Sequence, residues 1–167
     1  MSTLFVDTIN EKTSGNGVAI PGHVVQVVSS TSNSGTNSTS TSWAATNLSV
    51  SITPASASSK VLVTVSGGMN GWAGSNTTYD QKGGLKIYRS IGGGTFAEVE
   101  SSSSGQQVQY GRGGEYDPLS ITYLDSPNTT SSVVYKLYMR RESGTLTFSV
   151  IRDSNNQATM TAMEIAQ

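Results

Sequence analysis

The sequence contains no cysteine and a single histidine, His23. The absence of thiols excludes disulfides, thiolate metal sites and a cysteine nucleophile, and one imidazole leaves transition metals without an adequate ligand set. We therefore expect neither a metal nor another cofactor. A Ser-His-Asp site would have to use His23, but no G-x-S-x-G sequence marks a nucleophile near it, so we expect a structural or surface role for this residue.

Charge is also scarce, because charged residues make up 13% of the chain and the formal net charge at pH 7 is −1. A protein without a basic excess neutralises few phosphates, so nucleic acid is not an expected partner. No stretch approaches the roughly 18 apolar residues of a membrane span, and the start MSTLFVDT lacks the basic and apolar regions of a signal peptide. We expect no membrane insertion.

Small polar residues are abundant instead, since Ser, Thr, Gly and Asn make up 76 of the 167 residues. Such residues suit turns and the solvent side of strands. Apolar and polar residues alternate with a period of two, and no segment keeps a helical period for three turns. This pattern predicts strands with one core face and one wetter face in the runs 48–53, 60–66, 85–87, 119–123, 133–139, 146–150 and 158–166.

Turn-forming segments, such as Gly92–Gly94 and Asp125–Thr130, separate these runs. About eight main strands follow residue 22, which favours an all-β fold, an antiparallel β-sandwich of the jelly-roll kind. The polar stretch from Ser29 to Ser42 is interpreted as a solvated linker between strands.

Two further long polar stretches, Gly67–Gly84 and Glu100–Asp117, contain aromatic residues. An aromatic surface with nearby Asn, Asp and Arg is what binding of a sugar or a protein epitope requires. The alternative is that these rings pack inward under their loops or at a subunit interface. Trp43, before the strand that contains Leu48, is expected to be a core or interface anchor. The candidate receptor-binding residues are therefore Trp72, Tyr79, Tyr110, Arg112 and Tyr116.

Residues 1–22 differ from the rest, because two short alternating segments flank the turn sequence Ser14-Gly-Asn-Gly17. One hairpin is marginal alone and needs a partner surface. We expect residues 1–22 to form an anchor or assembly segment and residues 23–167 to form the β-sandwich. The candidate assembly residues are Leu4, Val6, Ile9, Val18 and Ile20.

This N-terminal segment resembles a motif of tail-fibre and other virion structural proteins of tailed phages, especially marine and cyanobacterial ones, in which VDTI…TSGNGV.I.G precedes or builds a fibrous β-region. The segments 42–69, 83–90, 120–140 and 158–167 resemble, in that order, the C-terminal knobs of such proteins. The resemblance implies a non-enzymatic protein on the virion surface with a jelly-roll-like, trimeric knob. The partners it implies are further copies of the chain, other tail or capsid proteins, and a host surface glycan or protein.

Several alternatives stay open. A capsid decoration protein, either a cement or a head-fibre protein, is one, because the sequence has at most one repeat-like unit where a typical fibre has a long shaft. A surface-glycan hydrolase would use a carboxylate pair, Glu98 with Glu100 or Glu115 with Asp117, although solvated turn carboxylates are favoured. A free-standing carbohydrate-binding module would be monomeric. In the trimer, the apolar face with Tyr135 is a candidate for contacts shared across subunits.

Overall fold

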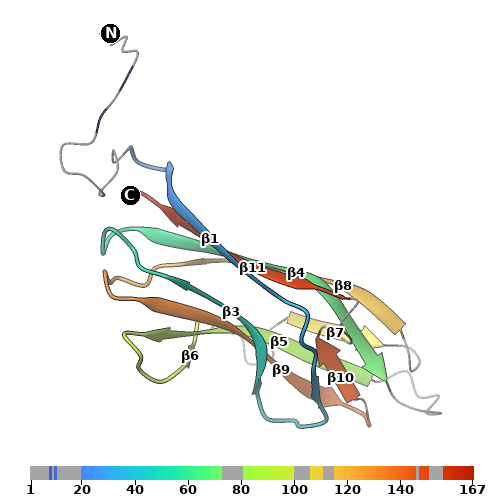
Figure 1. Cartoon of the computed structure of the whole chain (residues 1–167). Coiled ribbons are helices and arrows are strands. Elements are labelled where there is room, and N and C mark those ends of the chain that lie inside the picture. Colours follow the sequence, from blue (N-terminus) through green and yellow to red (C-terminus); the bar gives the residue numbers. More distant parts are fainter. Residues whose placement is uncertain are drawn as a thin grey trace.

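The computed structural model describes residues 8, 10, 20–72, 81–99, 106–110, 115–145, 147–150 and 156–167. Every regular element in these segments is a strand (Figure 1). No helix in the described part of the chain is long and apolar enough to cross a membrane. The strands are β1 (Val24–Ser32), β2 (Thr36–Ser38), β3 (Ala44–Ile52), β4 (Lys60–Trp72), β5 (Gln81–Ile91), β6 (Ala97–Glu98), β7 (Gln106–Tyr110), β8 (Glu115–Asp125), β9 (Val133–Ser143), β10 (Thr147–Val150) and β11 (Ala158–Ile165).

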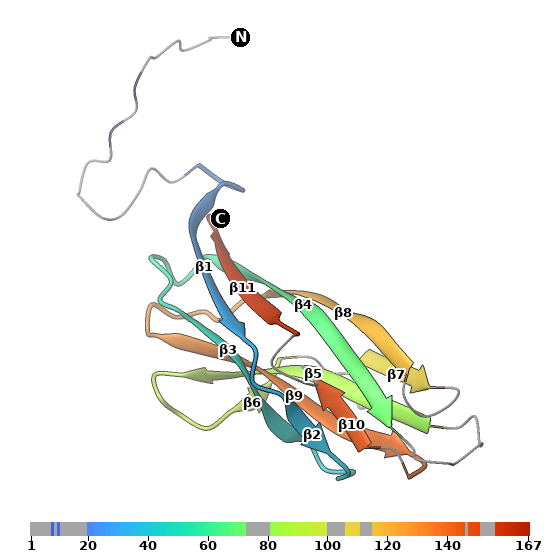
Figure 2. The same ribbon diagram turned by 45° about the vertical axis from the view of Figure 1, so that its right-hand side comes forward.

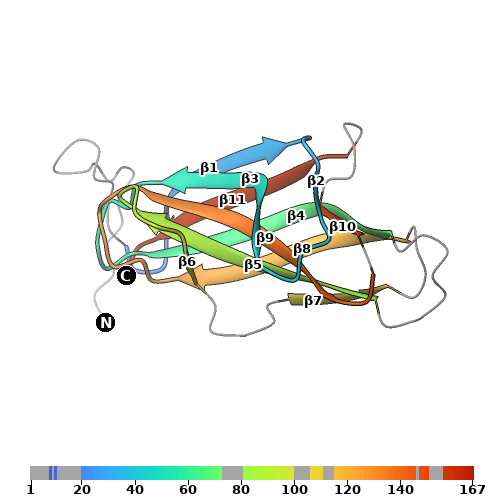
Figure 3. The same ribbon diagram turned by 90° about the horizontal axis from the view of Figure 1, so that it is seen from below.

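The strands form two antiparallel sheets. Sheet A has the order β1-β11-β4-β10-β2, with β8 also paired to β4, and sheet B has the order β3-β9-β5-β6, with β7 also paired to β5. Figure 3 is seen from the side of sheet B, with β3, β9 and β5 in front of β4. The prediction of an all-β chain with antiparallel sheets is confirmed, and the arrangement is compatible with a β-sandwich.

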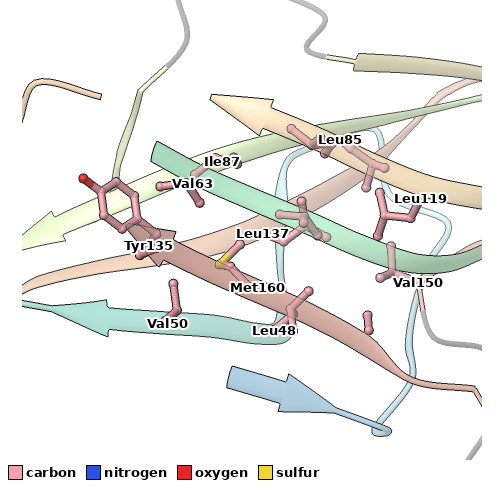
Figure 4. Close-up of a cluster of buried hydrophobic side chains, with 14 of the residues drawn as sticks. Leu48, Val50, Val63, Leu85, Ile87, Leu119, Tyr135, Leu137, Val150 and Met160 are labelled. Atoms are coloured by element: carbon pink, nitrogen blue, oxygen red, sulfur yellow. The ribbon is translucent and has the colours of Figure 1, made fainter. Parts of the chain in front are cut away.

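The core lies between the sheets and contains the apolar residues that alternate along the predicted runs (Figure 4). Leu48, Val50 and Ile52 of β3 are buried, while Ser51 and Thr53 are exposed. The apolar face with Tyr135 is fully buried inside one chain. The expectation that subunits share this face is therefore wrong, because the face already packs within its own core. The core residues include Leu48, Val50, Ile52, Val61, Val63, Val65, Leu85, Ile87, Leu119, Val133, Tyr135, Leu137, Met139, Phe148, Val150 and Met160.

The polar stretches contain more strand than the sequence suggested. The expected linker Ser29–Ser42 includes the second half of β1 and all of β2. Strand β1 pairs with β11 from Val24 opposite Ile165 to Ser32 opposite Ala158. This pairing provides hydrogen-bond partners for the backbone N–H and C=O groups of a segment that has the composition of a linker. Serine and threonine are acceptable on the surface of a strand. The linker interpretation is therefore wrong for these residues.

A buried carboxylate joins three segments at the end of sheet A where the C-terminus lies. Glu164 of β11 is fully buried, and its Oε2 accepts a hydrogen bond from Gln26 Nε2 of β1 at 2.6 Å. Its Oε1 accepts hydrogen bonds from the backbone N–H groups of Ala55 at 2.9 Å and Ser56 at 3.4 Å. Glu164 therefore fixes β1 and the β3–β4 connection to β11.

A second buried carboxylate connects the two sheets. Asp125 of β8, in sheet A, accepts hydrogen bonds from Arg89 Nη1 at 2.5 and 2.6 Å and from the Tyr135 hydroxyl at 2.7 Å. Arg89 and Tyr135 lie opposite each other in sheet B. Burial, and then the hydrogen bond to Asp125, raise the pKa of Tyr135. This residue therefore donates to the carboxylate as a neutral phenol.

Candidate functional site

The outer face of sheet B carries a concentration of aromatic and cationic side chains. In β5, Lys86 and Tyr88 alternate with buried core residues, and in β9 Lys136, Tyr138 and Arg140 do the same. Since successive side chains of a strand point to opposite faces, these five project away from the core. Both strands have hydrogen-bonded neighbours on each side, so the face is built on rigid elements.

The register of β5 against β9 brings the two tyrosines together. Lys86 lies opposite Tyr138, and Tyr88 lies opposite Lys136. Tyr88 and Tyr138 are therefore diagonal neighbours, which is within reach of aromatic side chains. Their rings stack with centroids 4.0 Å apart and an interplanar angle of 27°.

Two more rings extend this pair into a row. Trp43, just before β3, has its ring centroid 6.5 Å from that of Tyr88, and Phe96, just before β6, has its centroid 6.0 Å from that of Tyr138. All four rings are partly buried, so each still presents some surface to solvent. Trp43 is thus an outer-face residue and not a core residue. We call the following set the aromatic face: Trp43, Lys86, Tyr88, Phe96, Glu98, Lys136, Tyr138 and Arg140.

The cations of this face lie against the rings. Arg140 Cζ is 4.5 Å and Lys86 Nζ is 5.2 Å from the centroid of the Trp43 ring, while Lys136 Nζ is 5.4 Å from that of Phe96. These distances are within the range of cation–π attraction. The rings and cations therefore hold one another in place before any ligand arrives.

Carboxylates neutralise two of the three cations. Lys86 is only 1% exposed, and its Nζ lies 2.5 Å from Glu98 Oε2, while Glu98 Oε1 accepts a hydrogen bond from the Tyr88 hydroxyl at 3.3 Å. The hydrogen bond from Lys86 is the main cause that lowers the pKa of Glu98. Burial, followed by the charge of Glu98, raises the pKa of Tyr88 to about 12.

The remaining charges leave the face with a cationic excess. Arg140 Nη2 lies 2.6 Å from Glu142 Oε1. Lys136 has no ion pair with any carboxylate of the described segments. Its ammonium lies beside Phe96, and the register places Lys136 opposite Tyr88 of β5 on one side and Ser49 of β3 on the other. This corner combines a cation, a hydroxyl and two rings, which suits a polar ligand with an apolar face.

The residues expected to bind a receptor are placed differently from the prediction. Trp72 ends β4, Tyr110 ends β7 and Tyr116 belongs to β8, so these three lie in strands and the assignment to loops is wrong for them. Tyr116 lies opposite Asn70, and Tyr110 lies opposite Gln81. The backbones of these strand ends meet at the end of the molecule away from the C-terminus (Figure 2). Their side chains, and all of Tyr79 and Arg112, lie outside what the structure describes.

The expected assembly residues lie mostly outside the described segments, namely Leu4, Val6, Ile9 and Val18. Ile20 is described and is 52% exposed. His23 Nδ1 lies 3.1 Å from the backbone N and 2.5 Å from the backbone O of Ile20, so His23 serves the turn that leads into β1. Hydrogen bonds from Gly22 N to Ala166 O at 2.8 Å and from Ala166 N to His23 O at 3.0 Å hold this turn to the C-terminus.

The carboxylate pairs considered for hydrolysis are only partly described. Glu98 belongs to the aromatic face, and its lowered pKa is the opposite of what a general acid requires. Asp117 is partly buried, while Glu100 and the side chain of Glu115 lie outside the described part. The described residues contain no group of three His, Asp or Glu side chains suited to a metal ion.

Comparison with known proteins gives no identification: no family model matches the chain, and no curated protein is similar to it. The function must therefore be argued from the geometry. What the aromatic face offers is a rigid set of rings with cations and hydroxyls beside them, an arrangement suited to binding.

Proposed function

We propose that the chain is a non-enzymatic virion structural protein of a tailed phage, a homotrimeric tail-fibre or tail-appendage component that binds the host surface. The observation that carries this proposal is the aromatic face, in which partly accessible rings and cations pack together on the outer side of a rigid sheet. An attachment protein needs such a preorganised surface, because groups already fixed lose little entropy on binding.

The strand pairing supports the jelly-roll form of the knob. Strands β1 and β11, β3 and β9, β4 and β8, and β5 and β7 pair antiparallel, so the pairs are nested from the chain ends inward. Of these four pairs, the first and third lie in sheet A and the second and fourth lie in sheet B, while the short pair of β2 with β10 also belongs to sheet A. Alternation of nested pairs between two facing sheets is what a rolled-up long hairpin produces.

We expect the ligand to be a surface glycan of the host. A sugar ring has apolar C–H faces that contact aromatic rings, and hydroxyls that accept hydrogen bonds from ammonium and phenol groups. Lys136 and the Tyr138 ring provide both kinds of contact on one surface. The binding step moves no covalent bond, so it needs no acid or nucleophile.

The test is binding of the full chain to immobilised bacterial lipopolysaccharides and capsular polysaccharides. Tyr138→Ala and Lys136→Gln should each weaken binding roughly tenfold or more, which corresponds to loss of one important contact. Thr122→Ala, on the outer face of sheet A, is the control and should bind like the unchanged protein. Unchanged binding by both aromatic-face variants would refute this location of the site.

A second pair of variants separates the aromatic face from the receptor residues predicted by the sequence. Trp72→Ala and Tyr116→Ala change strand ends away from the C-terminus, so they should leave glycan binding intact. If these two variants lose binding while Tyr138→Ala retains it, the attachment site lies at those strand ends. Release of reducing ends from the polysaccharides, abolished by Glu98→Gln, would instead support the hydrolase.

A further inference from the structure

The outer face of sheet A carries an apolar patch near the end where the C-terminus lies. The registers place Val27 opposite Met163, Met163 opposite Leu62, and Leu62 opposite Leu124, which makes one row across β1, β11, β4 and β8. In the next row, Val24 lies opposite Ile165. We call these residues the apolar patch: Val24, Val27, Leu62, Leu124, Met163 and Ile165.

These side chains are accessible. Val24 is 48%, Val27 56% and Leu124 47% exposed, while the other three are partly buried. Ile20, four residues before the start of β1, is also exposed. Most of the large apolar side chains exposed in the described part therefore gather at one end of one face, whereas single exposed apolar residues scattered over a surface are normal.

A polar rim borders the patch. Two rows of hydroxyl side chains follow it along the same strands, and on the other side Lys60 lies opposite Ile165. An apolar centre with a polar rim is the usual composition of a protein–protein interface. The hydroxyl rows are Ser29, Thr161, Thr64 and Thr122, followed by Thr31, Thr159, Ser66 and Ser120.

Sheet A ends beside the patch at strand β1. Strand β1 has the sequence VVQVVSSTS and pairs only with β11, so its other edge has no strand partner in the described part of the chain. Natural edge strands are usually protected from association by charged residues or proline. Strand β1 has neither, and its Val24 and Val27 belong to the patch.

We infer that the apolar patch, together with the free edge of β1, is a contact surface between copies of this chain. Because the patch and its hydroxyl rim are almost without charge, they offer little to a charged partner, whereas a second copy presents the same neutral surface. The turn at residues 20–23 is held beside the C-terminus, so copies joined here would have these turns near the contact. The inference shares with the proposed function only the expectation that the chain self-assembles. It does not depend on glycan binding, because the aromatic face lies on the other sheet.

The first test is the mass of the full chain by light scattering over a concentration series. We expect a multiple of 17.5 kDa for the unchanged protein and the monomer mass for Val27→Lys and Leu124→Lys. Ile91→Lys changes another exposed apolar residue, 36% exposed, that lies outside the patch and should keep the assembled mass. Monomeric unchanged protein, or lysine variants that keep the assembled mass, would overturn the inference.

Cross-linking gives a second measurement that does not depend on the lysine variants folding. Because the chain has no cysteine, Val27→Cys and Leu124→Cys each introduce a unique thiol. A short bismaleimide should cross-link these variants into covalent dimers and leave Ile91→Cys monomeric; equal yields from all three would contradict the inference. Glycan binding is measured separately, so a monomer that binds glycan through the aromatic face would refute the assembly surface but not attachment.

Discussion

Tyr88 and Tyr138 stack with ring centroids 4.0 Å apart on the outer face of sheet B, although 50 positions separate them in the sequence. Stacking of two partly buried rings between Trp43 and Phe96 fixes the geometry of the face. Such pairs contribute about 0.5–1.5 kcal/mol beyond the area they bury. The stacking therefore has a consequence for stability as well as for binding.

We predict that Tyr138→Ala lowers the free energy of unfolding by about 1–2 kcal/mol, whereas Tyr138→Phe changes it by less than about 0.5 kcal/mol. Phenylalanine keeps the ring that stacks on Tyr88, and alanine removes it. Urea denaturation of both variants measures the difference. Equal losses for alanine and phenylalanine would show that the ring contact does not stabilise the fold.

The sequence predicted the core of this molecule more completely than its surface. The period-two runs around Val50, Val63 and Leu137 are confirmed as strands because alternation itself determines which side chains turn inward. The same alternation places Lys86 and Tyr138 on outer faces, but a single strand does not reveal its register with another strand. The aromatic face and the apolar patch exist only through that register, and so neither could be predicted from the sequence.

Composition alone is a misleading guide to the polar segments of this chain. Ser29–Ser42 has the composition of a linker, yet β1 pairs with β11, which lies at the other end of the chain. The signal that could have located the aromatic face is present in LKIYRS and VYKLYMR, where lysine, tyrosine and arginine occupy the polar positions of strands with an apolar core side. Tyrosines at the polar positions of two strands make their outer face a candidate for binding. Serine and threonine at such positions indicate only exposure to solvent.

We predict that Gly67→Ala is destabilising and that Gly68→Ala is tolerated. A Cβ at position 67 would lie 2.5 Å from Ala158 Cβ and 2.9 Å from Ala158 Cα, whereas a Cβ at position 68 has no neighbour within 4 Å. Overpacking of this kind costs about 1–3 kcal/mol, and an alanine that fits stabilises by up to about 1 kcal/mol. Thermal unfolding of the two variants makes the comparison at neighbouring positions of one strand. A similar melting temperature for both would mean that β11 moves away from β4 at little cost.

We predict that stability decreases as the pH rises above 10 and that Tyr135→Phe weakens this dependence. The ordinary pKa of tyrosine is 10.0, and burial raises the pKa of Tyr135 in the folded protein. The unfolded chain therefore releases this proton first, so the stabilisation is complete below pH 10 and declines above it. At pH 7 the variant should lose about 1–3 kcal/mol, because Asp125 loses a hydrogen-bond donor.

Tyr88→Phe is the comparison for this experiment. Tyr88 has a pKa of about 12 in the folded protein. Its titration therefore also lowers the stability as the pH rises above 10, but this effect ends once the pH passes that value. Urea unfolding at pH 7, 10 and 11 separates the two residues. An unchanged pH dependence in Tyr135→Phe would show that the buried phenol is not the group that titrates.

The last prediction concerns Glu164, whose carboxylate joins β11 to Gln26 of β1 and to the backbone of Ala55. We predict that Glu164→Gln lowers the free energy of unfolding by about 1–3 kcal/mol, because Gln26 Nε2 already donates to Thr53 O at 2.7 Å and cannot turn its oxygen toward a new amide donor without losing that bond. A double-mutant cycle with Gln26→Ala measures the coupling directly. If the effects of the two changes simply add, the hydrogen bond between these side chains does not hold β1 in the sheet. In that case only the backbone pairing with β11 would hold Val27 and the free edge of β1 in position.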